Sequence, residues 1–388
     1  MNNGTNGLTI QSLSRAAKRP VVHCVIGREP VLRLSQMLAE FSARCGQPGA
    51  MDDISYFLSK PGVLPRIPNL LLVTRSKELN LLSPKLDNLL GTLLIFEQSI
   101  RGFGVGAFAT NDRAGRSTLV AEPSERSRIA ALTSRALLDR GAHLILMSFR
   151  AVDELESLGA IQPPLLQVAE SGRAVARWAQ RQRSIPGYLP LASTFDATLA
   201  KIGQRTRSNL RYYRRRAESD LGCVFMPRIE VSREELLAFS RECMYAVTPE
   251  VTGWRYDALK ELAEPVFMGI KDRDGRWLSM LGGRRYLDRS ELLWQLNREG
   301  LAANSLGTVM RSYFIEHEIA HGSRRMYIEG GTQHPIKFSF VPEQLTDLVV
   351  LRRSLMSKAM QMVARHAISL DNELSHMLSA KDLTWQAC

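Results

Sequence analysis

Residues 291–340 constrain the fold of this chain most strongly, because they switch repeatedly between strand, loop and helix patterns. A strand (ELLWQLN) leads into a loop of small residues (REGLAANSLGT) and a helix (VMRSYFIEHEIAHG), followed by a second strand (SRRMYIEGG) and a lysine-bearing loop (TQHPIKFSF). A small-residue loop that opens onto a helix leaves backbone N–H groups free at the positive end of the helix dipole. Such an end is suited to binding the phosphates of a nucleotide-like ligand.

The length of the chain predicts more than one domain. Its 388 residues exceed one ordinary core, and two domains of about 150–200 residues each are expected. A polar, proline-bearing stretch at residues 162–170 is predicted as the boundary between them. We therefore expect a disordered tail over residues 1–18, an N-terminal domain over 19–165 and a C-terminal domain over 166–388.

Both predicted domains alternate helix and strand patterns, so the expected fold class is α/β (α+β), with mixed central sheets flanked by helices. In the first domain the patterns predict helices over 28–46 and 124–141 and strands within 69–75, 91–112 and 143–150. In the second they predict one long helix over 193–222, three strands within 265–297 and a C-terminal helix over 344–369.

Composition excludes several classes of protein. With 45% hydrophobic and 23% charged residues, the chain is typical of globular rather than disordered proteins. Its five scattered cysteines have no CxxC spacing, which argues against a disulfide framework and a zinc site. No apolar run approaches the roughly 18–20 residues that span a bilayer, and no secretory signal is recognisable. We expect a cytoplasmic protein without a transmembrane segment, whose net charge of +12 favours anionic partners.

Two segments together resemble those of acyltransferases of the GNAT superfamily. They are residues 291–340 and the arginine-rich helix TRSNLRYYRRR at 206–216. The pattern is most similar to the cellulose-biosynthesis (CelD/BcsL-like) acetyltransferases and the related FemABX aminoacyltransferases, and it covers roughly residues 170–345 well. The resemblance implies tandem GNAT-like domains, the first of them degenerate, with acetyl-CoA or another acyl-CoA as co-substrate and no metal.

The loop before the central helix matches the GNAT cofactor signature, Gln/Arg-x-x-Gly-x-Gly/Ala, only in part. Ser305 and Gly307 stand at the glycine pair, whereas Ala302 replaces the polar residue that opens the motif. The resemblance implies an acyl-CoA loop made of Asn304, Ser305, Leu306, Gly307 and Thr308. The alternative is an ordinary helix N-cap, in a protein whose cofactor site has been lost.

The arginine-rich helix is the candidate substrate-binding element. Residues 201–216 contain seven basic residues and no acidic one, so like charges repel each other along the helix unless an anion is bound. The resemblance places this helix beside the acceptor site, with Arg207, Asn209, Arg211 and Arg215 as substrate-binding residues. A solvated helix face and a nucleic-acid surface are the alternatives.

Glu329 and Lys337 are the candidate catalytic residues. Glu329 ends the second strand of the segment, where a carboxylate can take a proton from an acceptor. Lys337 follows in the next loop, where its charge can stabilise an oxyanion. In the related families an acidic residue, a glycine-rich turn and a lysine before an aromatic recur here, and this chain has Glu329, Gly330, Gly331, Lys337 and Phe338. A surface ion pair is the alternative, and His334 is a further candidate for proton transfer.

Three functional hypotheses follow. The first is direct acyl transfer from acyl-CoA to the amine or hydroxyl of a small or glycosidic acceptor, which can be anionic, in polysaccharide or cell-envelope biosynthesis. The second is a FemABX-like transferase that uses aminoacyl-tRNA, and the third is a non-catalytic regulator or scaffold with a GNAT fold. No metal is expected, because His317 and His321 have helical i,i+4 spacing but lack a third ligand.

Overall fold

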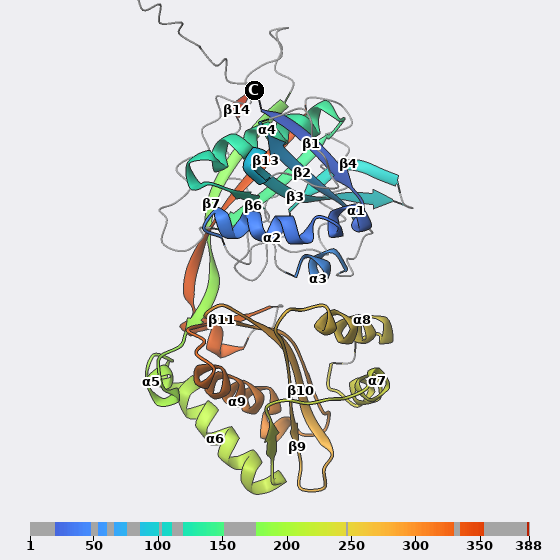
Figure 1. Ribbon diagram of the computed structural model, residues 1–388. Coiled ribbons are helices and arrows are strands. Elements are labelled where there is room, and N and C mark those ends of the chain that lie inside the picture. Colours follow the sequence, from blue (N-terminus) through green and yellow to red (C-terminus); the bar gives the residue numbers. More distant parts are fainter. Residues whose placement is uncertain are drawn as a thin grey trace, which may run out of the picture.

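The computed structural model describes residues 20–47, 53–59, 66–75, 86–100, 103–110, 119–150, 176–245, 247–329, 334–352 and 386–387. Within these ranges the chain forms two lobes, which are joined by the long strands β7 (Ala176–Pro190) and β13 (Val341–Arg352) (Figure 1). Each lobe is a sheet with helices against it, which confirms the α/β class with mixed sheets. The predicted tail and the predicted boundary at 165/166 lie outside the described residues, and the division into two domains stays a prediction.

The first lobe is built on a sheet in the order β1-β2-β3-β4-β6-β13-β7, in which only β4 and β6 pair in parallel. Its other strands are β1 (Val21–Ile26), β2 (Arg66–Thr74), β3 (Leu89–Ile100), β4 (Phe103–Ala109) and β6 (Leu144–Arg150), with β5 (Leu119–Ala121) beside β3 and β14 (Gln386–Ala387) beside β7.

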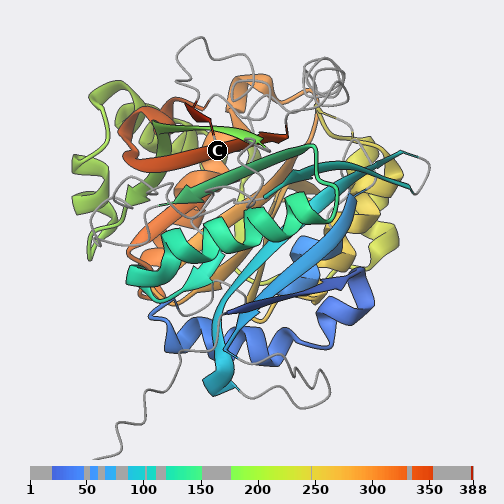
Figure 2. The ribbon, with the colours of Figure 1, turned by 90° about the horizontal axis from the view of Figure 1, so that it is seen from above.

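Helices cover both faces of this sheet. One face carries α4 (Arg126–Asp139), which lies across the strands in the turned view (Figure 2). The opposite face carries α1 (Arg28–Leu32) and α2 (Ser35–Arg44), and α3 (Ile54–Ser59) follows them at the side of the second lobe (Figure 1). The short helices η1 (Leu86–Asn88) and η2 (Pro123–Glu125) precede β3 and α4.

The second lobe continues the strand path from the end of β7 in the order β12-β11-β10-β9-β8. Its strands are β8 (Val224–Met226), β9 (Pro265–Lys271), β10 (Trp277–Tyr286), β11 (Arg289–Asn297) and β12 (Arg325–Ile328). Its helices are α5 (Phe195–Ala200), α6 (Gln204–Leu221), α7 (Arg233–Arg241), α8 (Pro249–Lys260) and α9 (Leu306–Ala320), with the short helices η4 (Ala302–Asn304) and η5 (Pro335–Ser339).

The helices of the second lobe pack on opposite faces of its sheet (Figure 1). On one face α6 and α9 share a core with Val266, Met268 and Ile270 of β9. On the other face α7 and α8 share a core with Trp294 of β11, and Tyr56 of the first lobe belongs to this second core.

Two helix predictions are wrong in part. The predicted helix over 193–222 is two helices, because the chain is extended at Gly203 between α5 and α6. The predicted helix over 344–369 begins as strand β13, and residues 353–369 lie outside the described ranges. In β13, Leu348 and Val350 join one core and Val349 and Leu351 join another, so successive side chains are buried on opposite faces.

A buried ion network connects the lobes. Arg284 of β10 is wholly buried and pairs with Glu291 of β11, Nε to Oε2, over 2.7 Å. It also pairs with Asp53, which precedes α3 in the first lobe. Asp53 Oδ1 accepts a second bond, of 2.6 Å, from the backbone N–H of Ala263. These contacts fix α3 against the second lobe. Within the described ranges, no helix is both long enough and apolar enough to cross a membrane.

Candidate active site

A cavity of about 800 Å³ lies where α9 begins, beside β11. Ser305, Leu306 and Gly307 of the predicted cofactor loop line it, and so does Glu329. The structure thus brings one predicted catalytic residue together with three of the predicted loop residues. Asn304 and Thr308 are buried close to this lining without being part of it.

The cavity follows a point at which two strands part. Strands β11 and β12 run parallel but pair only over residues 289–292 and 325–328. The N–H of Glu329 then donates to the carbonyl of Leu292 over 2.8 Å. Beyond this bond no described strand pairs with residues 293–295 on this side of β11. Residues 293–295 all line the cavity, so an edge of backbone N–H and C=O groups is open to a ligand.

Helix α9 presents its N-terminal end to the cavity. Ser305 precedes it in the left-handed conformation, with φ of 47°, and its side chain does not cap the helix. Its hydroxyl instead contacts Thr308 Oγ1 over 2.8 Å. The N–H of Thr308 donates to the carbonyl of Ser305 over 2.8 Å, so the N–H groups of Leu306 and Gly307 are the ones left for a ligand at the positive end of the helix dipole.

Arg311, one turn into α9, is the most unusual side chain of the cavity. It is 6% exposed, and its Nε forms no hydrogen bond with any described residue. Burial lowers its pKa to about 10. Its Nη1 would lie 3.6 Å from a Cβ atom at Gly307, so the guanidinium reaches back to the helix start. Because a buried cation without a counter-charge is unstable, this end of the cavity favours an anion.

Glu329 is held by a residue of the first lobe. The hydroxyl of Tyr56 donates to Glu329 Oε2 over 3.3 Å. Burial, with the nearby charge of Glu329, raises the pKa of Tyr56, so the hydroxyl stays a donor. Tyr56 packs against Trp254 of α8, with ring centres 5.8 Å apart. The first lobe therefore contacts Glu329 at the point where β11 and β12 part, although none of its described residues lines the cavity.

Lys337 and His334 flank the cavity from η5. Lys337 is not part of the lining, but burial and the charge of Arg311 lower its pKa. His334 does line the cavity, and burial lowers its pKa to about 4. Its Nδ1 accepts from the backbone N–H of Ile336 over 3.2 Å, which places the proton of the neutral ring on Nε2. Nε2 then donates to Thr308 Oγ1 over 3.1 Å, so His334 fixes the start of α9.

The predicted substrate-binding residues of α6 lie apart from this cavity. Arg207, Asn209, Arg211 and Arg215 are absent from its lining. Arg211 pairs with Asp196 of α5 over 2.6 Å, and the neighbouring Arg214 pairs with Glu316 of α9. Carboxylates outside the basic run thus neutralise charges that the sequence shows as unopposed. The role of these four residues in substrate binding stays a prediction.

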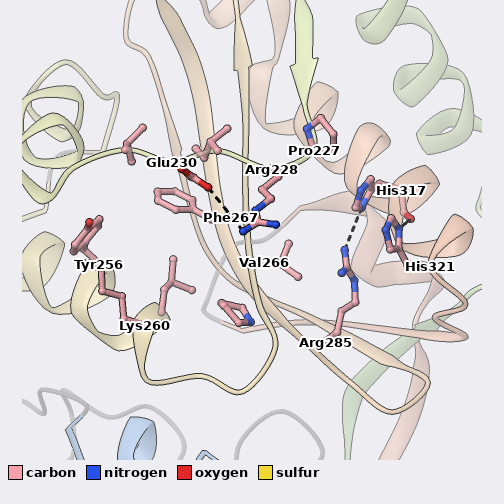
Figure 3. Close-up of a pocket in the computed structure, with 14 residues that line it drawn as sticks. Pro227, Arg228, Glu230, Tyr256, Lys260, Val266, Phe267, Arg285, His317 and His321 are labelled. Carbon is pink, nitrogen blue, oxygen red and sulfur yellow. Dashed lines mark hydrogen bonds and ion pairs between the residues drawn. The ribbon is translucent and has the colours of Figure 1, made fainter.

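A second cavity of about 700 Å³ lies between α8, β9 and the end of α9. Figure 3 shows Arg285 reaching towards His317, with His321 beside it and Tyr256 and Lys260 on the opposite side. The carboxylate of Glu318 accepts a hydrogen bond from Arg285 Nε over 2.8 Å and another from His317 Nδ1 over 3.1 Å. In the part of the chain that the structure describes, no group of three or more His, Cys, Asp or Glu side chains is suited to a metal.

Three residues of the candidate site were not found from the sequence. Arg311 could have been found, since it is the one charged residue within the apolar stretch 309–315 of a helix. Tyr56 and Arg255 have no such local signal, because Tyr56 is 273 positions from Glu329 and Arg255 reaches the cavity only through the packing of α8.

Comparison with known proteins gives likeness in structure only. No family model matches the sequence, and no curated protein matches it. The crystal structure of FemX matches 76% of this chain and 90% of its own, at 12% identity and a TM-score of 0.47. A tandem GNAT protein from the clavulanic acid biosynthesis pathway matches 86% and 99%, at 12% identity and a TM-score of 0.43. L-PGS from Bacillus licheniformis matches 72% and 85%, at 11% identity and a TM-score of 0.44.

These likenesses extend over most of each chain, but their identities and TM-scores are too low to assign a substrate or a site residue. The sequence resemblance was to the GNAT superfamily and to FemABX enzymes, and a GNAT protein and FemX are among these structures. Its CelD/BcsL-like part stays a prediction. The function is therefore argued from the residues of the cavity.

Proposed function

We propose that this chain is an acyltransferase that transfers an acyl group from acetyl-CoA or another acyl-CoA to an amine or hydroxyl acceptor. The observation that carries the proposal is the buried guanidinium of Arg311 at the uncapped start of α9. The sequence resemblance adds a polysaccharide or cell-envelope acceptor as the context.

The residues around Arg311 fit the phosphates of CoA. Free N–H groups at a helix N-terminus bind phosphate oxygens, and a guanidinium binds them through two parallel hydrogen bonds. The backbone of Gly307 leaves room there, since a Cβ would meet Arg311 Nη1 and Asn297 Nδ2 at 3.6 Å. Lys337 adds a positive charge nearby. A phosphate group would supply the counter-charge that Arg311 lacks among the described residues.

The open edge of β11 fits the arm of CoA. This arm is extended and contains amide groups, and an extended amide chain can pair with a sheet edge as an added strand. Residues 293–295 offer such an edge, and it runs from the region of Glu329 towards the start of α9. An arm laid along it would place the phosphates at Arg311 and the thioester near Glu329.

The residues of the chain would transfer a proton and stabilise the charges that develop during the reaction. When bound, acyl-CoA supplies an activated acyl group. Glu329 takes a proton from the acceptor, and the hydroxyl of Tyr56 holds its carboxylate in place. The sequence assigns Lys337 to the charge that develops on the acyl oxygen, and this role stays a prediction, because Lys337 lies near Arg311 at the phosphate end. Bringing both substrates together where β11 and β12 part supplies a large share of the rate.

An aminoacyl-tRNA donor is the main alternative, and the structure offers it less support. It would need α6 to hold a polyanion, whereas Arg211, Arg214 and Arg216 of α6 pair with carboxylates. Retention of labelled tRNA on a filter tests this alternative directly. Salt-sensitive retention at submicromolar protein would favour it over acyl-CoA.

Calorimetric titration of the full chain with acetyl-CoA, CoA and pantetheine tests the proposal. We expect acetyl-CoA and CoA to bind and pantetheine, which lacks the phosphates, to bind much more weakly. At a hundred times its Kd, acetyl-CoA should stabilise the folded state by about 2.7 kcal/mol. No binding of acetyl-CoA would contradict the proposal. Binding without thiol release towards any amine or hydroxyl acceptor would instead favour a non-catalytic regulator.

A further inference from the structure

Arg255 of α8 is a second guanidinium in the cavity at the start of α9 for which the described residues provide no carboxylate partner. It lines the cavity and is partly buried. Within the described ranges it forms no ion pair with any Asp or Glu, Glu329 included, and its main contact is with Trp294, whose ring centre lies 6.0 Å away. The other lining arginine outside α9, Arg298, pairs with Glu242 and is neutralised. Arg255 therefore offers a positive charge that no described carboxylate neutralises.

Arg255 and Arg311 reach the cavity from opposite sides of the sheet. Arg311 belongs to α9, which packs on one face, and Arg255 belongs to α8, which packs on the other. The cavity is lined by both, so it passes through the opening between β11 and β12. A ligand on the α8 side would be distinct from one bound at the start of α9.

Tyr56 connects Glu329 with helix α8, and so with the α8 side of the cavity. Its ring packs on Trp254, the residue before Arg255, and its hydroxyl reaches Glu329 Oε2 over 3.3 Å. The α8 side of the cavity thus has one guanidinium without a carboxylate partner and, on the other side of Tyr56, one carboxylate. This arrangement complements a molecule with an amine at one position and an anionic group at another.

The charge of the anionic group can be inferred from the number of cations. The start of α9 combines a helix N-terminus, Arg311 and the nearby Lys337, which suits the multiple charges of phosphates. Among the described lining residues, the α8 side has Arg255 as its one unpaired cation, since Arg298 pairs with Glu242. A single guanidinium matches a carboxylate, with one charge and two coplanar oxygens.

We propose that the acceptor is an amine that also carries a carboxylate, such as a free amino acid, and that Arg255 binds this carboxylate while the amine faces Glu329. The inference rests on the proposed acyl transfer. In the reaction the amine nitrogen forms a bond to the acyl carbon and the carbon–sulfur bond of the thioester breaks. The proton lost by the nitrogen passes to Glu329, and the thiolate leaves and is protonated. The products are an N-acyl amino acid and the free thiol of CoA.

Matched acceptors test the carboxylate requirement with the full-length protein and acetyl-CoA. Four groups of acceptors are compared. They are the standard amino acids, their carboxamides, the corresponding amines without the carboxylate, and two amines that carry a phosphate (phosphoethanolamine and glucosamine phosphate). Thiol release and the mass of the acylated product are the readouts. We expect kcat/KM for at least one amino acid to exceed that for its carboxamide by about 10- to 100-fold, the range for a charge-assisted hydrogen bond. Equal rates with carboxamides, or a preference for phosphates, would overturn the inference.

Variants then assign the effect to Arg255. Arg255→Gln should raise KM for the amino acid by about 10- to 100-fold, leave the rate with the carboxamide unchanged and leave the Kd of acetyl-CoA unchanged. Arg255→Lys, which keeps the charge but not the planar fork, should recover part of the loss. Arg241→Gln, an exposed arginine of α7 outside the cavity, is the matched control. An Arg255→Gln variant that keeps wild-type KM would overturn the inference.

The proposed function and this inference fail in different ways. If acetyl-CoA binds but amino acids are not acylated, only the inference is overturned. If acetyl-CoA does not bind, both are overturned.

Discussion

The hydroxyl of Tyr56, in the first lobe, donates a hydrogen bond of 3.3 Å to Glu329 Oε2 in the second lobe. Tyr56 follows Asp53, which pairs with the buried Arg284 of β10 and accepts the N–H of Ala263. The ion network that fastens the lobes together therefore also places the tyrosine that orients the candidate base. In this arrangement the first lobe contacts the candidate active site, even though the proposed cofactor loop belongs to the second lobe.

Removal of the Tyr56 hydroxyl tests this relationship. Tyr56→Phe should lower kcat by about tenfold, equivalent to about 1.4 kcal/mol, because one hydrogen bond to a charged group is lost. The Kd of acetyl-CoA should not change, since the start of α9 is untouched. Tyr212→Phe, at an exposed tyrosine of α6, is the control. An unchanged kcat in Tyr56→Phe would show that Glu329 does not depend on the first lobe.

The buried ion network should dominate the stability of the lobe interface. Arg284→Leu leaves Glu291 buried without its partner, so we expect the free energy of unfolding to fall by about 3–5 kcal/mol. Arg216→Leu removes an exposed surface pair with Asp220 and should leave the free energy of unfolding close to that of the wild type. Urea denaturation of both variants measures the difference. Equal losses would mean that the network is not the main link between the lobes.

The pH dependence of stability should report on His334. Its folded pKa, about 4, lies below the ordinary histidine value of 6.5, so the unfolded chain takes up a proton that the folded chain does not. The stability that this histidine contributes is therefore complete above pH 6.5 and decreases as the pH falls towards about 4. In His334→Gln this titration is absent. As the pH falls from 6.5 to about 4, the urea midpoint of unfolding of the variant should therefore decrease less than that of the wild type. Parallel profiles for the two proteins would contradict the assignment.

A methyl group at Gly307 should separate stability from binding. Gly307→Ala replaces a glycine in the first turn of α9, and alanine stabilises a helix by about 0.5–1 kcal/mol relative to glycine. The added Cβ meets Arg311 Nη1 and Asn297 Nδ2 at 3.6 Å, an ordinary contact, but occupies the place proposed for a phosphate. We expect a higher Tm and at least about tenfold weaker acetyl-CoA binding.

The control for Gly307→Ala is Gly203→Ala, where the added Cβ meets no atom within 4 Å. It lies outside the cavity and should leave binding unchanged. A Gly307→Ala variant that is more stable and binds acetyl-CoA as well as the wild type would place the phosphates elsewhere.

Local sequence patterns predicted most elements of the second lobe but not β13, one of the two strands that join it to the first lobe. The strands within 265–297 and the helix after Ser305 were predicted close to their observed places. In β13 the run Leu348, Val349, Val350 and Leu351 is buried on both faces, and a short apolar run of this kind is compatible with helix and strand alike. Its burial depends on β6 and β7, which a local pattern does not show.

The same distinction separates the parts of the candidate site. Ser305, Gly307 and Glu329 are close in sequence and belong to one strand–helix–strand unit, so their grouping in one cavity could be predicted. The arginines of α6 were interpreted as free because their partners Asp196 and Glu316 lie on other helices. Arg255 and Tyr56 reach the site through packing between distant elements, and no spacing in the sequence indicates it.

The central claim is that Arg311 binds the phosphates of acyl-CoA, and a calorimetric titration of wild type and Arg311→Met with acetyl-CoA tests it most directly. Methionine has a similar length without the charge, so the unliganded variant should be at least as stable as the wild type, because a buried cation that no described carboxylate neutralises is removed. The account predicts that the wild type binds acetyl-CoA and that Arg311→Met binds it about 10- to 100-fold more weakly. Equal affinity in a folded Arg311→Met variant, or no binding by the wild type, would contradict it.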